Sequence, residues 1–174
     1  KRIVELGSGL GNNLMVVSKN FPDVIIESRE LSQTARNLQE VFLTKDIKNF
    51  DLDTFNLFSQ ENSFSFEGAV VFTSYVFSLV KCFPKNIIDA LILSGAKYVI
   101  NVEPIYEIQD ENCNLGSKIR EYISANDYNI DYYEKLLEYE ASGKVRILTV
   151  ERNKYGINPF FPAGLLIWEI CNEN

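Results

Sequence analysis

The residues with the clearest capacity for chemistry stand at the start of the chain, where an acid is followed by three alternating glycines. The segment is Glu5-Leu6-Gly7-Ser8-Gly9-Leu10-Gly11. Glycine has no Cβ, so this backbone can turn tightly and let a ligand approach closely. A strand pattern precedes the segment and a helical pattern follows it. Because the first N–H groups of a helix have no partner within the helix, this arrangement predicts a ligand-binding turn.

The glycine spacing and the acid separate the kinds of ligand that such a turn holds. Dinucleotide sites use Gly-x-Gly-x-x-Gly with the pyrophosphate on the helix N-terminus. Here the spacing is Gly-x-Gly-x-Gly, and Asn12 stands where the third glycine of that motif would fall. The Gly-Lys-Ser/Thr of a Walker A loop is missing as well. Glu5 would repel a pyrophosphate, whereas it suits a ligand that carries an ammonium and a sulfonium.

A second acid, Glu30, lies 19 residues beyond Gly11 and follows a β-branched stretch. A carboxylate at this range can accept hydrogen bonds from both ribose hydroxyls of a nucleoside. The alternative is a solvated acid at a helix start, stabilised by the helix dipole. Asp46 is expected beyond a third strand, where it would bond an adenine amino group. Asp51 is a rival for that role, and a plain surface acid is the other alternative for Asp46.

These motifs resemble class I S-adenosylmethionine-dependent methyltransferases, and at the level of pattern the resemblance covers nearly the whole chain. It implies that Glu5 and the glycines hold the methionine part, Glu30 the ribose and Asp46 the adenine. It also implies that the end of the fourth strand lines the methyl-transfer site. The residues expected to hold S-adenosylmethionine are Glu5, Gly7, Ser8, Gly9, Leu10, Gly11, Asn13, Glu30, Leu31, Asp46, Thr73 and Ser74. The family often has an Asp early in the fourth strand, where this chain has Glu67 and Gly68.

Methyl transfer is an in-line displacement, so bringing the nucleophile and the methyl together supplies much of the catalysis. An alcohol or amine acceptor must also lose a proton. Glu103 is the preferred base, because a carboxylate beside Pro104 at a strand end would be held in place. Its alternatives are a helix cap or an ion pair with Arg120 or Arg152. Tyr75 is the second catalytic candidate; it either bonds the acceptor or packs on the adenosine.

Aromatic residues gather in two later segments. The loop Asn158–Pro162, stiffened by two prolines, either walls an acceptor pocket or covers the sheet edge. The tyrosines of the other segment offer a surface for a substrate or partner, although tyrosines at helical spacing more often pack in a core. They are Tyr122, Tyr128, Tyr132 and Tyr133.

The elements that must position these residues alternate between strand and helix patterns. Strands are expected over Ile3–Leu6, Val24–Ile26, Gly68–Thr73, Tyr98–Val102, Val145–Val150 and Leu165–Ile170, with another at an open position within Thr44–Phe66. Helices are expected over Asn12–Phe21, Leu31–Leu43, from Pro84 to Gly95, and over Ile130–Ala141. Such alternation predicts an α/β fold, a single Rossmann-like doubly wound and mostly parallel sheet. The last two strands are expected to form an antiparallel pair at its edge, and the resemblance implies seven strands with the last one antiparallel.

Composition bounds the function further. The chain has 174 residues, which suits one domain over 1–174, with a net charge of −7, three cysteines and no histidine. The lack of histidine removes His-based triads, and the scattered cysteines predict reduced thiols in a cytoplasmic protein without a metal site. The sequence lacks the run of Lys or Arg that would indicate nucleic-acid binding. It also lacks an apolar stretch long enough for a membrane span. The chain starts without Met in a strand, so we expect a preceding segment.

The leading hypothesis is S-adenosylmethionine-dependent methyl transfer to an oxygen or nitrogen of a small molecule. The closing segment Gly143–Glu169 resembles bacterial sugar or small-molecule methyltransferases. Adenine-amino methyltransferases carry Pro-Pro-Tyr/Phe where this chain has Thr73-Ser74-Tyr75-Val76, which disfavours nucleic-acid targets. One alternative is a catalytically silent binding or scaffold module of the same fold. Another is a nicotinamide dehydrogenase, which Glu5 disfavours.

Overall fold

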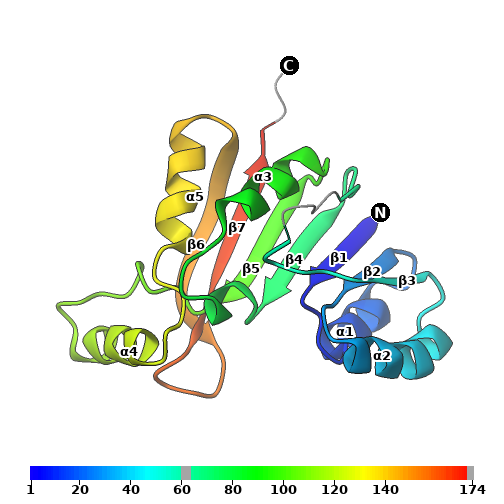
Figure 1. The fold of residues 1–174 in the computed structure, drawn as a ribbon, viewed down its shortest axis with the longest axis horizontal. Coiled ribbons are helices and arrows are strands. Elements are labelled where there is room, and N and C mark those ends of the chain that lie inside the picture. Colours follow the sequence, from blue (N-terminus) through cyan, green and yellow to red (C-terminus); the bar gives the residue numbers. More distant parts are fainter. Residues whose placement is uncertain (60–63, 172–174) are drawn as a thin grey trace.

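A twisted sheet of seven strands runs through the molecule, in the order β3-β2-β1-β4-β5-β7-β6 (Figure 1). The computed structural model describes residues 1–59 and 64–171. The strands are β1 (Arg2–Leu6), β2 (Ile25–Arg29), β3 (Phe50–Asp53), β4 (Val70–Ser74), β5 (Tyr98–Glu103), β6 (Val145–Tyr155) and β7 (Ala163–Ile170). The helices are α1 (Asn12–Asn20), α2 (Gln33–Asp46), α3 (Lys85–Leu93), α4 (Asn114–Ala125) and α5 (Tyr132–Ala141), with a 3₁₀ turn η1 at Phe77–Leu79.

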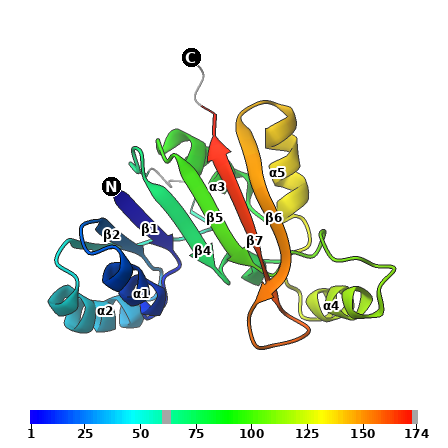
Figure 2. The same cartoon turned by 180° about the vertical axis from the view of Figure 1, so that it is seen from behind.

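The strand directions confirm the predicted architecture. Strands β1 to β5 are mutually parallel, and β7 runs antiparallel between β5 and β6. Helices α1 and α2 pack on one face of the sheet, while α3 and α5 pack on the other (Figure 2). We call the side where β1 to β5 end the carboxyl edge. In both views α4 and the β6–β7 loop lie beyond this edge (Figures 1 and 2), where ligands bind in open α/β sheets.

Two hydrophobic cores explain why these segments form these elements. On one face the alternate residues Val4, Leu6 and Val71 meet α3 and Trp168. On the other face Leu14 and Leu43 are in the core with β2. The central strands are covered by helices on both sides, so their sequences are apolar almost throughout, as in other parallel sheets.

The main departures from expectation concern weakly patterned segments. Strand β3 lies at Phe50–Asp53, within the stretch whose assignment was open, and its alternating half-buried and exposed residues suit an edge strand. Helix α4 was not predicted, although Ile119 and Ile123 form its buried stripe. Strand β6 continues five residues beyond Val150, with exposed residues at its end. Among the described residues, no helix is both long and apolar enough to span a bilayer.

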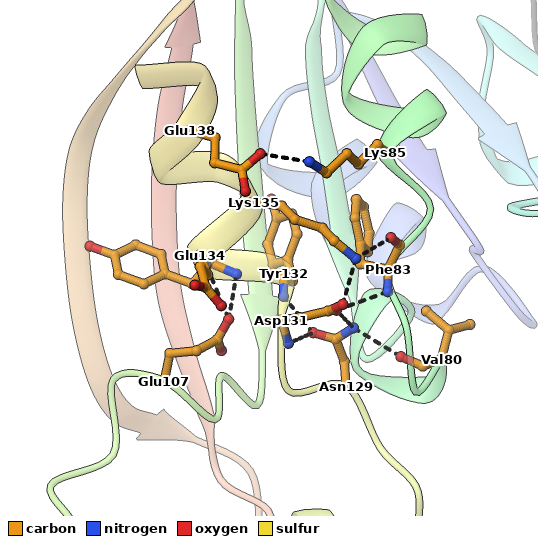
Figure 3. Close-up of polar contacts among 11 residues, drawn as sticks. Val80, Phe83, Lys85, Glu107, Asn129, Asp131, Tyr132, Glu134, Lys135 and Glu138 are labelled. Carbon is orange, nitrogen blue, oxygen red and sulfur yellow. Dashed lines mark hydrogen bonds and ion pairs between the residues drawn. The ribbon is translucent and has the colours of Figure 1, made fainter. Parts of the chain in front are cut away.

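Polar side chains tie the start of α5 to the segment that follows η1 (Figure 3). Asp131 accepts a hydrogen bond from the N–H of Phe83 at 2.9 Å, and Asn129 donates to the carbonyl of Val80 at 2.9 Å. One turn later Lys135 donates to the carbonyl of Phe83 at 2.7 Å. These contacts fix the helix that carries Tyr132 against the sheet.

A buried hydrogen-bonded group joins α5 to three strands. The Asn101 carbonyl oxygen accepts from the Tyr132 hydroxyl at 2.7 Å and from Trp168 Nε1 at 2.9 Å. The Asn101 amide donates to Thr73 Oγ1 at 2.9 Å. Because the indole N–H can only donate, the orientation of the Asn101 amide is determined. The group therefore links the protein core to the end of β4.

We expect Tyr132→Phe to lower the free energy of unfolding by about 1–2 kcal/mol, because it deletes a hydroxyl bonded inside the core. Tyr139→Phe on the same helix is the matched control. Its hydroxyl bonds Asp89 at the surface, so its loss should cost under about 0.5 kcal/mol. Denaturant unfolding of both variants measures the difference. Equal losses would show that the buried group adds no stability.

Candidate functional site

The glycine turn connects β1 to α1 at the carboxyl edge. Gly7 and Gly11 have φ values of 69° and 78°, in the left-handed region that side chains rarely adopt. A Cβ on Gly7 would lie 2.5 Å from a methyl of Val76, and one on Gly11 would lie 2.3 Å from a methyl of Leu43. Gly11 also serves as the N-cap of α1. Both conformation and close packing therefore require glycine here, as the sequence pattern predicted.

The turn is held by a closed ring of buried hydrogen bonds. Gln39 donates to Ser8 Oγ at 2.9 Å, Ser8 and Ser28 hydroxyls meet at 2.5 Å, and Ser28 donates to Gln39 Oε1 at 2.6 Å. Gln39 also donates to the carbonyl of Gly9 at 2.6 Å. Ser8 thus ties the turn to α2 and β2. Gln39 was not predicted, because only the fold brings α2 to the turn.

Glu5 lies at the base of the turn and is 1% exposed. Its Oε1 accepts from the Asn13 amide at 2.7 Å, whereas its buried Oε2 has no hydrogen-bond partner in the described structure. Burial raises the pKa of Glu5 from 4.5 to about 7, against the lowering effect of Asn13, and the nearby charge of Glu30 adds to the rise. A buried carboxylate oxygen without a partner is costly. It would gain most from a cationic hydrogen-bond donor.

Glu30 follows β2 and is 9% exposed, so it is a buried acid and not the solvated one of the alternative prediction. Its Oε1 accepts from the N–H of Ser32 at 2.7 Å, at the start of α2, and its Oε2 accepts from the N–H of Gly9 at 2.8 Å. Each carboxylate oxygen has a second lone pair that remains for a ligand. Leu10 and Leu31 stand beside these bonds, each 57% exposed. They offer an apolar surface next to the acid.

The expected position of Asp46 is wrong. Asp46 is the exposed last residue of α2, so it precedes β3 and lies away from the carboxyl edge. Asp51 points from the middle of β3 to an ion pair with Arg29 at 2.8 Å. Asp53 is the acid that ends β3, and its carbonyl accepts from the N–H of Glu30 at 3.0 Å. Asp53 could not be identified from the sequence, because the position of β3 was not predicted.

The end of β4 lies beside β1, with Thr73 in register with Leu6. Thr73 is fully buried and Ser74 is half-buried. Tyr75 has a φ of 55°, a left-handed conformation that costs a non-glycine residue about 1 kcal/mol or more. Its N–H donates to the carbonyl of Val102 at 3.1 Å. Strained residues gather at functional sites, which keeps Tyr75 as a candidate.

The Tyr75 side chain reaches the β6–β7 loop. Its hydroxyl donates to the carbonyl of Phe161 at 3.3 Å. A Cβ on Gly156, whose φ is 97°, would lie 2.3 Å from this hydroxyl oxygen. Burial raises the pKa of Tyr75, against the lowering effect of a hydrogen bond from Ala163, and the charge of Glu103 raises it further. The phenol is therefore neutral at pH 7.

Glu103 has a different role from the predicted base. It is 1% exposed, and its oxygens accept from the N–H groups of Val76 at 2.9 Å and Ser78 at 3.1 Å, and from the Ser78 hydroxyl at 2.8 Å. Burial raises its pKa, while hydrogen bonds from Val76, Thr73 and Ser78 lower it. The carboxylate caps η1, which was the alternative role considered from the sequence. We therefore describe Glu103 as a positioning residue for the segment after β4.

The aromatic segments divide between edge and core. Phe161 of the β6–β7 loop stacks on Tyr128 at a centroid distance of 4.2 Å and lies 6.0 Å from Tyr122 and 5.7 Å from Tyr75. This cluster is beside the end of β4. Tyr132, in contrast, packs in the main core. Arg120 lies 4.3 Å above the Tyr106 ring and pairs with Glu111, not with Glu103.

Comparison with protein-family models and with curated protein sequences gives no match. Comparison with solved structures gives the fold. A SAM dependent methyltransferase from Aquifex aeolicus has a TM-score of 0.62 and 17% identity over 97% of this chain and 82% of that chain. Geranyl diphosphate C-methyltransferase from Streptomyces coelicolor A3(2), solved with Mg²⁺, geranyl diphosphate and S-adenosyl-L-homocysteine, has a TM-score of 0.62 and 12% identity over 98% and 73%.

A third similar structure is an O-methyltransferase from neocarzinostatin biosynthesis in complex with S-adenosylmethionine and 2-hydroxy-5-methyl naphthoic acid. Its TM-score is 0.60 and its identity 13%, over 98% of this chain and 49% of that chain. At such identities these likenesses concern the fold alone. This chain has the Rossmann-like fold of S-adenosylmethionine-dependent methyltransferases.

We expect the stability advantage of wild type over Glu5→Gln to fall by about 3 kcal/mol between pH 4.5 and pH 7.5. The pKa of Glu5 is raised to about 7, so the folded state favours the protonated carboxyl. The stabilisation is therefore complete below pH 4.5 and is lost as the pH rises through 7. Denaturant unfolding of both proteins across this range measures it. A pH-independent difference would contradict a raised pKa.

We expect Glu103→Gln to lower the free energy of unfolding by about 2–3 kcal/mol, since one of two backbone N–H groups would face the new amide nitrogen. Glu40→Gln, on the exposed side of α2, is the matched control and should change stability by less than about 0.5 kcal/mol. Chemical denaturation gives both values. A Glu103→Gln protein as stable as wild type would argue against the capping role.

Proposed function

We propose that this chain binds S-adenosylmethionine at the glycine turn and transfers its methyl group to an oxygen or nitrogen of a small molecule. The observation that carries the proposal is the buried Glu5 oxygen without a partner, at the base of a turn where Gly7 and Gly11 leave no room for a Cβ. The methyltransferase fold of the similar structures, two of them solved with small-molecule substrates, favours transfer over a silent binding module.

The residues at the carboxyl edge fit the parts of this cofactor one by one. Glu5 would receive the ammonium of the methionine part, for which its free oxygen is suited. Glu30 would accept the ribose hydroxyls with its remaining lone pairs. The adenine would lie against Leu31, with Asp53 in place of Asp46 as the acid at the end of β3. A diphosphate, as in NAD, would meet the carboxylates of Glu5 and Glu30 at close range.

The chemistry that the cofactor would supply is a methyl group on a sulfonium, which leaves as a neutral thioether. The protein has to hold the acceptor in line with that methyl and to exclude water. Thr73, Ser74 and Tyr75 would border the transfer position at the end of β4. Glu103 would position these residues and would not touch the acceptor, since it holds the backbone of Val76 and Ser78, directly after them. The neutral Tyr75 hydroxyl would bond the acceptor atom.

The acceptor proton has no dedicated carboxylate base in this scheme, because the Glu103 oxygens are occupied by backbone and hydroxyl donors. The nucleophile therefore either attacks in its deprotonated form or releases its proton to solvent once its bond to the methyl carbon has formed. Phenols and amines meet this condition better than aliphatic alcohols, since their nucleophilic forms are populated nearer neutral pH. Among oxygen and nitrogen nucleophiles, the site therefore favours those of modest pKa.

We expect the full chain to bind S-adenosylhomocysteine, and Glu5→Gln to weaken that binding at least tenfold at pH 7.5, which corresponds to the loss of one charge-assisted hydrogen bond. Glu40→Gln, away from the turn, should bind like wild type. Isothermal titration calorimetry with S-adenosylhomocysteine and, in parallel, with NAD measures these affinities. Tighter binding of NAD, or equal affinity of the Glu5→Gln variant, would refute the assignment.

A further inference from the structure

Acidic side chains gather at the carboxyl edge of the sheet. Four of the five parallel strands, β1, β2, β3 and β5, have a carboxylate within their last two residues or directly after them: Glu5, Glu30, Asp53 and Glu103. Their hydrogen-bond partners are an amide, backbone N–H groups and hydroxyls. Within 1–59 and 64–171, none of these four forms an ion pair with Lys or Arg. Glu30 and Asp53 therefore place negative charge at the edge, whereas burial raises the pKa values of Glu5 and Glu103, so these two acids add charge only where they are ionised.

Glu107, in the loop after β5, adds a fifth carboxylate (Figure 3). Its Oε1 accepts from the N–H groups of Tyr133 at 2.8 Å and Glu134 at 3.1 Å, at the start of α5. Its Oε2 is buried and has no hydrogen-bond partner among the described residues. Both orphaned carboxylate oxygens of the described chain, on Glu5 and Glu107, thus belong to loops or strand ends of the same edge.

Most basic side chains near this edge pair with acids, whereas Arg36 of α2 donates to the carbonyls of Glu30 and Leu31. Lys81 pairs with Asp127, Lys118 with Glu121, Arg120 with Glu111, Lys135 with Asp131 and Lys154 with Glu151. Arg152 is exposed on β6, where water and salt screen its charge. An anionic group brought to the end of β4 would thus meet unneutralised carboxylates and no cluster of free cations from these elements.

Aromatic rings continue from the end of β4 to an open pocket. We call Tyr75, Phe161, Tyr128, Tyr122 and Phe160 the aromatic strip. Successive centroids along it, from Tyr75 through Phe161 and Tyr122 to Phe160, are 5.7, 6.0 and 6.3 Å apart. At its far end a pocket of about 280 Å³ is lined by Tyr122, Ala125, Phe160, Lys118 and Glu121. Phe160 is 43% exposed and Phe161 only 8%, so the free aromatic surface of the strip lies at its Phe160 end.

We propose that the acceptor is a planar, mainly apolar molecule, uncharged or cationic, that lies on the aromatic strip with its reacting atom at Tyr75. This inference rests on the proposed function and adds the substrate class. Aromatic rings bind planar molecules by stacking, and their faces attract cations. The carboxylates of the edge add attraction for a cation and reject an anion, so that selection comes from repulsion as well as from contact.

Three probes that share the naphthalene ring test the charge preference: 2-naphthol, 2-naphthylmethylamine and 2-naphthyl phosphate. Each is titrated by calorimetry at pH 7.5 into the full chain saturated with S-adenosylhomocysteine. We expect the neutral and cationic probes to bind at least tenfold more tightly than the phosphate. Equal or tighter binding of the phosphate, or no binding of any probe, would overturn the proposal.

Three variants test the location. Phe160→Ala should weaken the two favoured probes at least fivefold, whereas Leu93→Ala, which removes an 85% exposed side chain on α3, should leave them unchanged. Phe160→Leu, which retains the bulk but not the ring, should be intermediate. If the Phe160 variants bind the probes as tightly as wild type, the aromatic strip is not the binding site.

The two proposals fail separately. If S-adenosylhomocysteine binds and the probes show no charge preference, only the substrate class is wrong. If S-adenosylhomocysteine does not bind, the proposed function is wrong, and the same probes are titrated into the unliganded chain, whose carboxylates and rings are present without the nucleoside. The order of the three affinities then decides the charge preference alone.

Discussion

The carboxylate of Glu5 is the constraint on which the rest of the site depends. An acid buried to this degree is tolerated only where something stabilises its charge or where its pKa rises. In this chain one oxygen has the Asn13 amide and the other has no partner. The ring of hydrogen bonds among Gln39, Ser8 and Ser28 holds the backbone of the turn in place around it. The protein therefore retains an unmet need for a donor at the position where a ligand would bind.

A second constraint acts on the neighbouring strand end. A chain of hydrogen bonds with defined directions runs from the core to a carboxylate. Trp168 and Tyr132 donate to Asn101, Asn101 donates to Thr73, and Thr73 donates to Glu103. That carboxylate holds the backbone after β4, including the residue next to the strained Tyr75. The core of the protein thus determines the geometry of the proposed transfer position, which explains why a fully buried acid is retained at the end of β5.

The sequence was sufficient for the architecture and for the first half of the site. Alternating strand and helix patterns gave the order of elements, and the glycine spacing with Glu5 located the turn, because both signals are local. Asp46 was misplaced since β3 has only Phe50 and Leu52 as apolar residues, too few for a periodic signal. The sequence could not decide between a base and a cap for Glu103, because its partners lie 25 and 27 residues away and only the parallel pairing of β4 with β5 brings them close.

The contact between Tyr75 and Gly156 has a consequence for how such sequences diverge. The phenol oxygen occupies the space in which any side chain at 156 would begin, so the two positions share one volume. A lineage that replaces the tyrosine by a smaller residue frees that volume, and only then does the loop accept a larger residue in place of glycine. Positions 75 and 156, which are 81 residues apart, should therefore covary among related sequences, and that covariation would show where the acceptor side of the protein has changed.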